Sequence, residues 1–230
     1  MLGSSFIQKR VIIITLFFML LVLAVTLWMR RYYFPLMLLM LILSMLPFFS
    51  RFEKKKVNAE EIVIIAILAA IAAVSRVPFS ALPSVQPASF VIIASGLVFG
   101  PQVGFMVGTT SALASNFFLG QGPWTLFQMF AWGLMGLTAG LFQHARWMAH
   151  LFGQNVFGFT WGFLFGWFMN LWFILALFES ISWEVFLGAY AASFYFDLVH
   201  ALSNVFFITL FLGQWQKILG RIKIKYGILH

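Results

Sequence analysis

The stretch SNFFLGQGPWTLFQMFAWG (residues 115–133) ends one apolar run and begins another. The Gln-Gly-Pro sequence at 121–123 interrupts the hydrophobic pattern. Because glycine and proline interrupt helices, it predicts a break between two helices at this point. Trp124, Gln128 and Trp132 then follow at four-residue intervals, which places them on one face of a helix. The stretch therefore predicts two helices joined by a tight connection, with amide and indole groups gathered beside it.

The rest of the chain is also strongly apolar. Of its 230 residues, 63% are hydrophobic and 9% are charged, whereas soluble domains are about a quarter charged. No water-soluble core hides that much apolar surface, so we predict an all-α integral membrane protein. The chain contains no cysteine, which excludes disulfides, thiolate metal sites and a cysteine nucleophile.

Apolar runs of membrane-spanning length divide the chain into two parts. Two runs, at 11–28 and 33–49, predict an N-terminal hydrophobic hairpin followed by a highly charged linker, RFEKKKVNAEE. We place a domain boundary there, with the hairpin and linker at 1–57 and a six-helix membrane domain at 58–230. The six spans of that domain are expected near 60–75, 88–100, 101–119, 124–143, 155–178 and 184–212.

The basic residues predict how these spans are oriented, because lysine and arginine concentrate on the cytoplasmic side of membrane proteins. With both termini in the cytoplasm, all 14 basic residues except Arg30, Arg31 and Arg76 fall on that side. The net charge of +8 is therefore explained by membrane topology. We expect no nucleic-acid partner, since no basic stripe interleaved with exposed aromatics is present.

Polar and aromatic residues gather in the outer half of the predicted bundle. Asn116 ends one helix at the level where Trp124 begins the next. Apolar walls with a few polar groups are typical of a small-molecule pocket. We therefore predict a substrate-binding pocket that is reached from outside and is lined by Asn116, Gln121, Trp124, Gln128, Trp132, Asn170, Trp172 and Tyr190.

A second polar group lies in the last span, where Asp197, His200 and Asn204 share one helix face. A carboxylate at mid-membrane costs about 2.5–3.5 kcal/mol on insertion scales, so it must face the bundle interior and find a partner. His200 is the expected partner. Two interpretations compete, a polar clasp between helices and a functional proton relay or substrate ligand. We favour the clasp, because the span region offers no second carboxylate to receive a proton.

The sequence lacks the motifs of the common catalytic sites. It contains no Walker A sequence and no H-E-x-x-H, and we expect no enzyme activity, no metal site and no cofactor. An intramembrane Ser–His hydrolase built on Ser95 and His200 is an alternative of another class. Ile93 counts against it, because the nucleophile motif of such enzymes has glycine two residues before the serine.

Small residues fall at helical spacing in several spans. In lipid, such residues let helix backbones approach closely. We interpret the glycine series at 96–108 and at 158–166 as packing within the bundle. In the segment AILAAIAAV (66–74), alanines cover nearly the whole helix surface, which is more than one neighbouring helix can pack against. It predicts a docking face for another membrane protein, formed by Ala66, Ala69, Ala70 and Ala73.

These features resemble the S components of energy-coupling factor (ECF) vitamin transporters, over residues 58–230. The resemblance rests on AILAAIAAV, SRVPFSALPSVQP, GLVFGPQVGFMVG, SNFFLGQGPWTLFQMFAWG and DLVHALSN. The SRVPFSALPSVQP loop and the SNFFLGQGPWT block most resemble the subgroup assigned to cobalamin, the CbrT type. The N-terminal hairpin departs from the family pattern, since many members lack it.

The resemblance implies a substrate-binding subunit in a bacterial plasma membrane, which takes up a vitamin from outside. Transport would need a transmembrane coupling protein, which the alanine-rich helix meets, and two ATPase subunits that hydrolyse ATP. The first external loop, with Arg76, Pro83 and Gln86, would act as a lid over the pocket. Cobalamin or a precursor such as cobinamide is the expected ligand, and the alternative is a different vitamin or heterocyclic precursor.

Overall fold

A computed structural model of the chain describes residues 59–178 and 182–227, together with six isolated positions between 21 and 43. The chain divides into two units, Met1–Val57 and Asn58–His230. Apart from those isolated positions, the expected hairpin at 1–57 lies outside the described residues. The second unit contains all of the helices whose bounds the structure gives.

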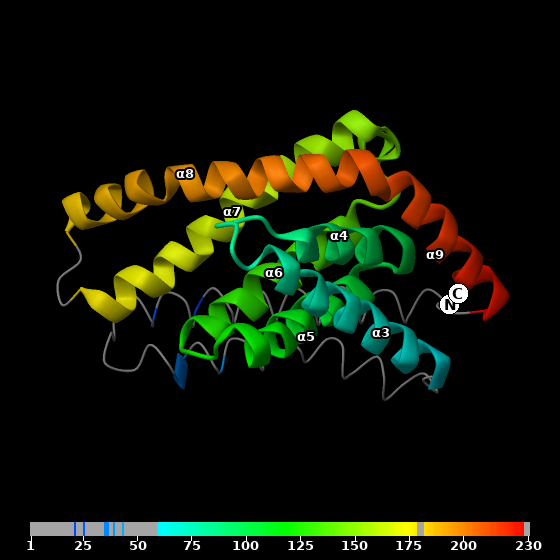
Figure 1. Cartoon of the computed structure of the whole chain (residues 1–230), viewed down its shortest axis with the longest axis horizontal. Helices are drawn as coiled ribbons and strands as arrows, with labels where there is room; N and C mark the ends of the chain where they lie inside the picture. The colour runs from blue at the N-terminus through cyan, green and yellow to red at the C-terminus, as the bar shows by residue number, and fades with distance from the viewer. Residues whose placement is uncertain are drawn as a thin grey trace. The chain divides into compact units, whose positions relative to one another are not determined.

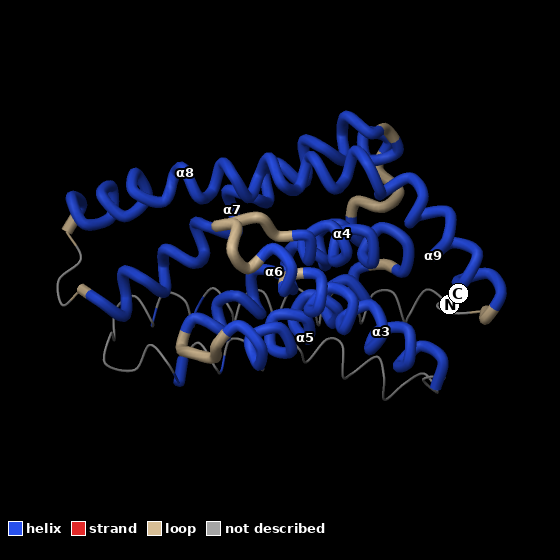
Figure 2. Tube along the Cα trace, in the orientation of Figure 1, coloured by secondary structure: helices blue, strands red, loops and turns tan. Residues whose placement is uncertain are grey.

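Apart from its loops and turns, the second unit is helical over its described residues and contains no β-strand there, which confirms the all-α fold (Figure 2). The observed helices fall where the six spans were predicted, and they are joined by short loops and turns. They are α3 (Ala59–Ser75), η2 (Val77–Phe79), α4 (Pro87–Phe99), α5 (Pro101–Leu119), α6 (Trp124–Leu141), η3 (Arg146–Ala149), α7 (Leu151–Leu177), α8 (Trp183–Phe207), the π-helical turn η4 (Ile208–Leu212) and α9 (Gly213–Lys225).

Glycine and proline set the ends of the central helices. Gly100 follows α4 with a φ of 96°, and Gly120 follows α5 with a φ of 106°. These left-handed values favour glycine, which lacks a Cβ atom. Pro101 then begins α5, where its missing N–H is no loss and its fixed φ suits a first helical turn. The Gly100-Pro101 pair therefore turns the chain directly from α4 into α5.

Glycines bring the backbones of α4, α5 and α6 into contact. A Cβ atom added to Gly136 of α6 would meet the carbonyl of Gly104 on α5, and one added to Gly96 of α4 would meet the carbonyl of Gly136. Gly108 faces the backbone of Trp132 in the same way. The four-residue glycine spacing is therefore used inside the bundle, as predicted.

Glycines also allow close contact between α7 and α8, which run side by side along one side of the other helices (Figure 1). A Cβ atom on Gly162 of α7 would meet the backbone of Ala201 on α8. One turn further along α7, a Cβ atom on Gly166 would meet the carboxylate of Asp197. The glycines of α7 thus leave room for both the backbone and a polar side chain of α8.

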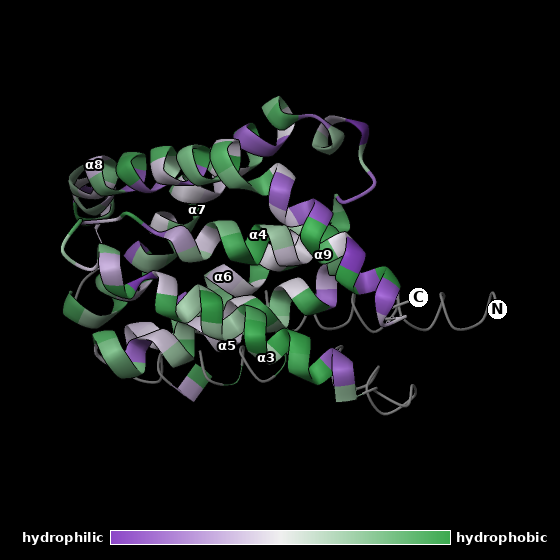
Figure 3. Ribbon diagram, turned by 45° about the vertical axis from the view of Figure 1, so that its right-hand side comes forward, coloured by the Kyte–Doolittle hydropathy of each residue, from purple (hydrophilic) through white to green (hydrophobic). Residues whose placement is uncertain are grey.

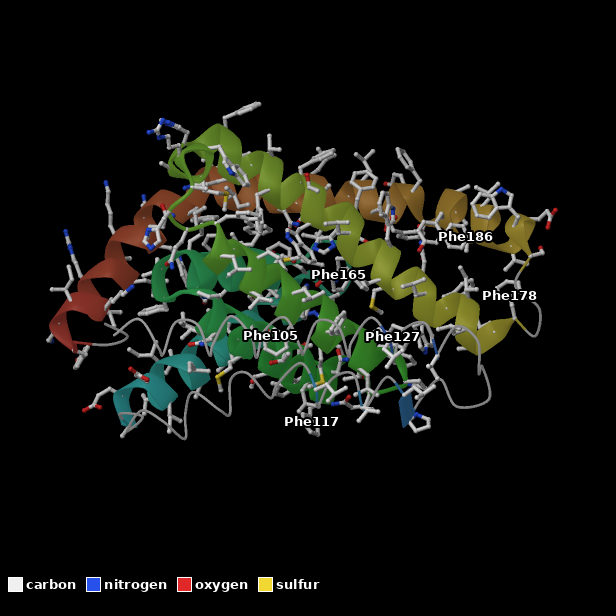
Figure 4. All side chains as sticks on the ribbon, turned by 180° about the vertical axis from the view of Figure 1, so that it is seen from behind. Phe105, Phe117, Phe127, Phe165, Phe178 and Phe186 are labelled. Carbon is white, nitrogen blue, oxygen red and sulfur yellow. The ribbon has the colours of Figure 1, made fainter. Side chains whose placement is uncertain are left out.

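The surface of the helical unit is rich in exposed aromatic residues. Phe152 is 80% exposed and Phe117 is 74% exposed, and Phe117 lies at the edge of the unit in Figure 4. Among the described residues, Ala59–Phe79, Leu151–Leu177 and Trp183–Lys225 are long and apolar enough to cross a membrane, and α4 is a shorter apolar helix. Lipid is the solvent that suits this surface, since water would not tolerate apolar patches of this extent.

The last helix, α9, has a different character. Hydrophilic residues recur along it, whereas α8 is mostly hydrophobic (Figure 3). Lys223 donates from Nζ to the backbone carbonyl of Val98, at 2.8 Å. A cation beside a helix C-terminus complements the helix dipole and satisfies a carbonyl that the helix leaves unpaired. The basic end of the chain is therefore attached to the C-terminal end of α4.

We expect Gly136→Ala to destabilise the full-length protein by about 1–3 kcal/mol, because the added methyl group overlaps the backbone of α5. The midpoint of thermal unfolding in detergent, followed by size-exclusion chromatography, should fall. Gly188→Ala is the matched control, since nothing lies within 4 Å of its Cβ position. Equal midpoints for the two variants would contradict the close approach of α5 and α6.

Candidate functional site

The polar residues at one end of the bundle meet around Arg76, which directly follows α3. Its Nε donates to Oε1 of Gln86 at 3.1 Å. Its Nη1 donates to Oγ of Ser115 and, at 3.1 Å, to Oδ1 of Asn116. Arg76 therefore joins the two ends of the 76–86 loop to each other and to the C-terminal end of α5.

Asn116 extends this network to α6. Its Nδ2 donates to Oγ1 of Thr125 at 2.9 Å and to Oε1 of Gln128 at 2.8 Å. Thr125 in turn donates to Oε1 of Gln121 at 3.0 Å. Asn116 and Gln128 are 2% and 5% exposed, so their amide groups depend on each other for hydrogen bonds. The polar residues of the 115–133 stretch thus hold its two helices together.

Trp132 lies one turn beyond Gln128 on α6 and is fully buried. The guanidinium carbon of Arg76 is 4.8 Å from its ring centroid. The ring of Phe165, which Figure 4 labels on α7, stacks on Trp132 with centroids 5.4 Å apart. Among the described residues, the indole Nε1 of Trp132 has no hydrogen-bond partner. A buried donor beside a half-buried cation is therefore left without an acceptor.

The remaining residues of the predicted pocket lie on or beside α7 and α8. Trp172 and Trp124 meet edge to face, with centroids 5.5 Å apart, and link α7 to α6. Asn170 donates from Nδ2 to Oγ of Ser193 at 2.7 Å. The hydroxyl of Tyr190 donates to a backbone carbonyl of α7 at 3.2 Å. The predicted pocket residues thus form two groups, one around Arg76 and one between α7 and α8.

The loop that was predicted to act as a lid makes contacts beyond its own ends. The backbone N–H of Gln86 donates to Oγ of Ser203 on α8 at 3.1 Å. Phe79 packs edge to face on Phe207, with centroids 5.6 Å apart. Arg76 and Gln86 are half-buried, while Pro83 is exposed. The loop therefore spans from α3 to α8 above the start of α4, and its role as a lid stays a prediction.

The trio on α8 faces the bundle interior, and Asp197, His200 and Asn204 are all buried. Asn204 donates from Nδ2 to a carbonyl of α7 at 2.9 Å, and His200 Nε2 lies 2.7 Å from Oγ of Ser89 on α4. Asp197 instead accepts a hydrogen bond from Ser193 on its own helix, at 3.0 Å. The expected pairing of Asp197 with His200 does not form, because the imidazole is directed to α4 and the carboxylate lies over the Gly166 position of α7.

The Ser–His pair of the hydrolase alternative does not form either. The Ser95 hydroxyl donates to the backbone carbonyl of Val91, one turn back on α4, at 2.7 Å. His200 is in contact with Ser89 instead. A serine nucleophile needs a base within hydrogen-bond reach, and Ser95 has none among the described residues. The hydroxyl of Ser95 therefore serves the helix on which it lies.

The alanines of α3 fall on two different faces. Ala69 and Ala73 are each 2% exposed, because their face of α3 packs into the bundle. These two residues are therefore not available to a partner, which corrects the prediction made for them. Ala66 and Ala70 are exposed. They share the outer face of α3 with large apolar side chains, among them Ile62, Val63, Ile67 and Val74.

Sequence reasoning missed the hydroxyl residues that complete these networks. Thr125 accepts from Asn116, while Ser193 accepts from Asn170 and donates to Asp197. A serine or threonine in an apolar helix usually reads as a small packing residue. Their spacing in the sequence could have identified them. Thr125 precedes Gln128 by three residues and Ser193 precedes Asp197 by four, which places each hydroxyl on the same helix face as the polar residue that follows it.

Comparison with known proteins places this arrangement in a family context. A family described as "ECF-type riboflavin transporter, S component" matches residues 56–217. A UPF0397 protein of Vibrio atlanticus is 33% identical over 90 residues, which cover 37% of this chain and 49% of that protein. UPF0397 proteins of Aliivibrio fischeri and Aliivibrio salmonicida are 32% identical with the same coverage, 37% and 49%. The chain thus spans about half the length of these curated relatives, and no solved structure matches it.

We expect Asn116→Leu to destabilise the fold by about 1–3 kcal/mol, because it leaves the buried acceptor of Gln128 and one donor of Arg76 without a partner. Thermal unfolding of the full chain in detergent measures this loss. Asn155→Leu is the matched control, since Asn155 bonds to Thr209 in an exposed position and should matter little. Equal midpoints of thermal unfolding for Asn116→Leu and Asn155→Leu would show that the hydrogen bonds of Asn116 contribute nothing to stability.

Proposed function

This chain belongs to the ECF-type riboflavin transporter S-component family, and from that premise we propose that it is the substrate-binding subunit of a vitamin importer. It captures a vitamin-sized molecule at the loop end of the bundle, which we assign to the outer side of the membrane. Transport across the membrane requires separate subunits, a transmembrane coupling protein and two ATPases. The absence of a Walker A motif from the sequence agrees with this division of labour.

One observation supports the binding function most directly. Buried amides, a guanidinium and indole rings converge below the 76–86 loop, where Arg76, Asn116 and Gln128 contact one another in series. Structural packing in lipid needs small residues and isolated hydrogen bonds. Polar groups gathered among flat aromatic faces suit recognition of a heterocyclic molecule. The guanidinium and the amides are hydrogen-bonded to one another, so a ligand must replace some of their mutual bonds.

Two ligand candidates follow from different observations. Cobalamin is favoured by the likeness of the SRVPFSALPSVQP loop and the SNFFLGQGPWT block to the cobalamin subgroup. Its side-chain amides could pair with Asn116, Gln121 and Gln128, since an amide both donates and accepts. Riboflavin is favoured by the description of the matching family. A flavin ring would stack on the indoles of Trp124 and Trp172, which lie edge to face.

The binding function is tested by titrating the full-length protein, in lipid nanodiscs, with cyanocobalamin, cobinamide and riboflavin in turn. We expect saturable one-to-one binding of one of these compounds, followed by isothermal titration calorimetry. Gln128→Ala should weaken that binding about tenfold, through the loss of a buried hydrogen bond. Gln214→Ala, at an exposed position on α9, should leave the affinity unchanged. Failure of all three compounds to bind would overturn the cobalamin and riboflavin assignments.

The outer face of α3 is proposed as the surface that meets the coupling protein. Ala66 and Ala70 are exposed there, and their small side chains allow a partner helix to approach closely. We expect the double change Ala66→Leu and Ala70→Leu to abolish uptake of the labelled vitamin in cells that carry the coupling module. Vitamin binding to the purified variant should remain as in the unmodified chain.

A double change on another exposed helix is the control for that experiment. Ala191→Leu with Ala192→Leu alters two exposed alanines of α8 and should leave uptake intact. Normal uptake by the α3 variant would show that this face does not carry the coupling contact.

A further inference from the structure

Arg76 carries a positive charge that has no negative partner in the described part of the chain. Its three hydrogen bonds go to the neutral oxygens of Gln86, Ser115 and Asn116. None of the residues that the structure describes places a carboxylate in salt-bridge contact with it. Removing an unpaired charge from water costs several kcal/mol, and neutral acceptors compensate this cost less well than an anion. The guanidinium is therefore held by neutral oxygens and by the ring of Trp132, and no described carboxylate neutralises its charge.

Two donors beside this charge also lack acceptors. Nη2 of Arg76 donates to no described residue, although Nε and Nη1 are both engaged. The indole N–H of Trp132 is buried without a partner among the described residues, and its ring lies 4.8 Å from the guanidinium carbon. A buried donor that stays unpaired costs about 1–3 kcal/mol; this cost applies to the indole, whereas Nη2 belongs to a half-buried side chain. An acceptor that reaches both groups would pair the indole N–H and bind the guanidinium.

We infer that Arg76 is the anion receptor of the binding site, and that the ligand presents an oxyanion, a carboxylate or a phosphate ester, to Arg76 and to Nε1 of Trp132. The inference rests on the proposed function and adds the chemical class of the ligand. A guanidinium suits this task because its planar set of donors matches two oxygens of one anionic group. Phe165, stacked on Trp132, holds the indole ring in place.

This assignment separates the ligand candidates by their charge. Cobalamin contains a phosphodiester, which cobinamide lacks, and riboflavin carries no negative group at neutral pH. An oxyanion requirement therefore favours cobalamin over cobinamide and over riboflavin. It also gives Arg76 a direct contact with the ligand, in addition to the bonds that join the ends of the loop.

The test uses pairs of compounds that differ by an oxyanion. Cobinamide phosphate with cobinamide and flavin mononucleotide with riboflavin carry or lack a phosphate ester, while biotin with biotinamide and pantothenate with pantothenol carry or lack a carboxylate. Calorimetry with the full-length protein in nanodiscs gives both affinities of each pair. For the compound family that binds, we expect the anionic member to bind about 10- to 100-fold more tightly, as charge-assisted hydrogen bonds would give.

Substitution of Arg76 locates the effect. Arg76→Gln should remove the preference for the anion while the neutral member keeps its affinity, and Arg76→Lys should retain part of the preference. Arg146→Gln, at an exposed position of η3, is the matched control and should change neither affinity. Trp132→Phe keeps the ring but removes the N–H, so it should reduce the affinity for the anionic member alone. Trp147→Phe, at a 43% exposed position, should not.

Each other outcome has a distinct meaning. Equal binding of the two members by the unmodified chain overturns the anion receptor and leaves the binding function standing. Equal weakening of both members by Arg76→Gln shows that Arg76 only holds the loop in place, and this also overturns the inference. If Arg76→Gln does not fold, the test rests on Trp132→Phe: a loss of affinity for the anionic member alone supports the anion receptor, and equal affinities of the variant and the unmodified chain for that member overturn it. Absence of binding by every compound overturns the proposed function, and the anion receptor with it.

Discussion

The backbone contact of α4, α5 and α6 is the constraint on which the site depends. Gly96, Gly104 and Gly136 remove the side chains that would otherwise keep these helices apart. Dispersion between closely packed atoms then replaces the hydrophobic effect, which provides little attraction between helices in lipid. Because the contact fixes α5 against α6, it also fixes Asn116 opposite Gln128. The position of these candidate site residues is thus a consequence of glycine spacing several turns away.

Polar groups inside the bundle are arranged in two separate systems. One surrounds Arg76 and reaches the loop, while the other joins α8 to α7 and α4 through Asn204 and His200. The second system has short, direct bonds between neighbouring helices, as a structural tie requires. Each system contains one buried polar atom without a partner among the described residues, Nε1 of Trp132 in the first and Oδ1 of Asn204 in the second. What sets the first system apart is the charge of the Arg76 guanidinium.

The sequence predicted the helices well because apolar length and Gly or Pro interruption are local properties, readable one segment at a time. It also indicated that Asn116 and Gln128 lie near each other, as their hydrogen bond shows, while their role in binding stays a prediction. It failed where the answer depended on which face of a helix meets which neighbour. The alanines of α3 occur on several faces, so the pattern alone could not show that Ala69 and Ala73 are buried. The partners of His200 and Asp197 required the positions of α4 and α7.

If Arg76 binds the solute as proposed, its hydrogen bonds connect solute binding to the attachment of the 76–86 loop. A guanidinium that turns toward a solute must give up bonds to Gln86, Ser115 or Asn116, which join the loop ends to α5. Solute binding and the release of the loop ends are then coupled in one equilibrium. The free energy that holds the loop in place in the empty protein is therefore subtracted from the free energy of solute binding. Weakening those bonds from the loop side, at Gln86, would raise affinity without touching the solute.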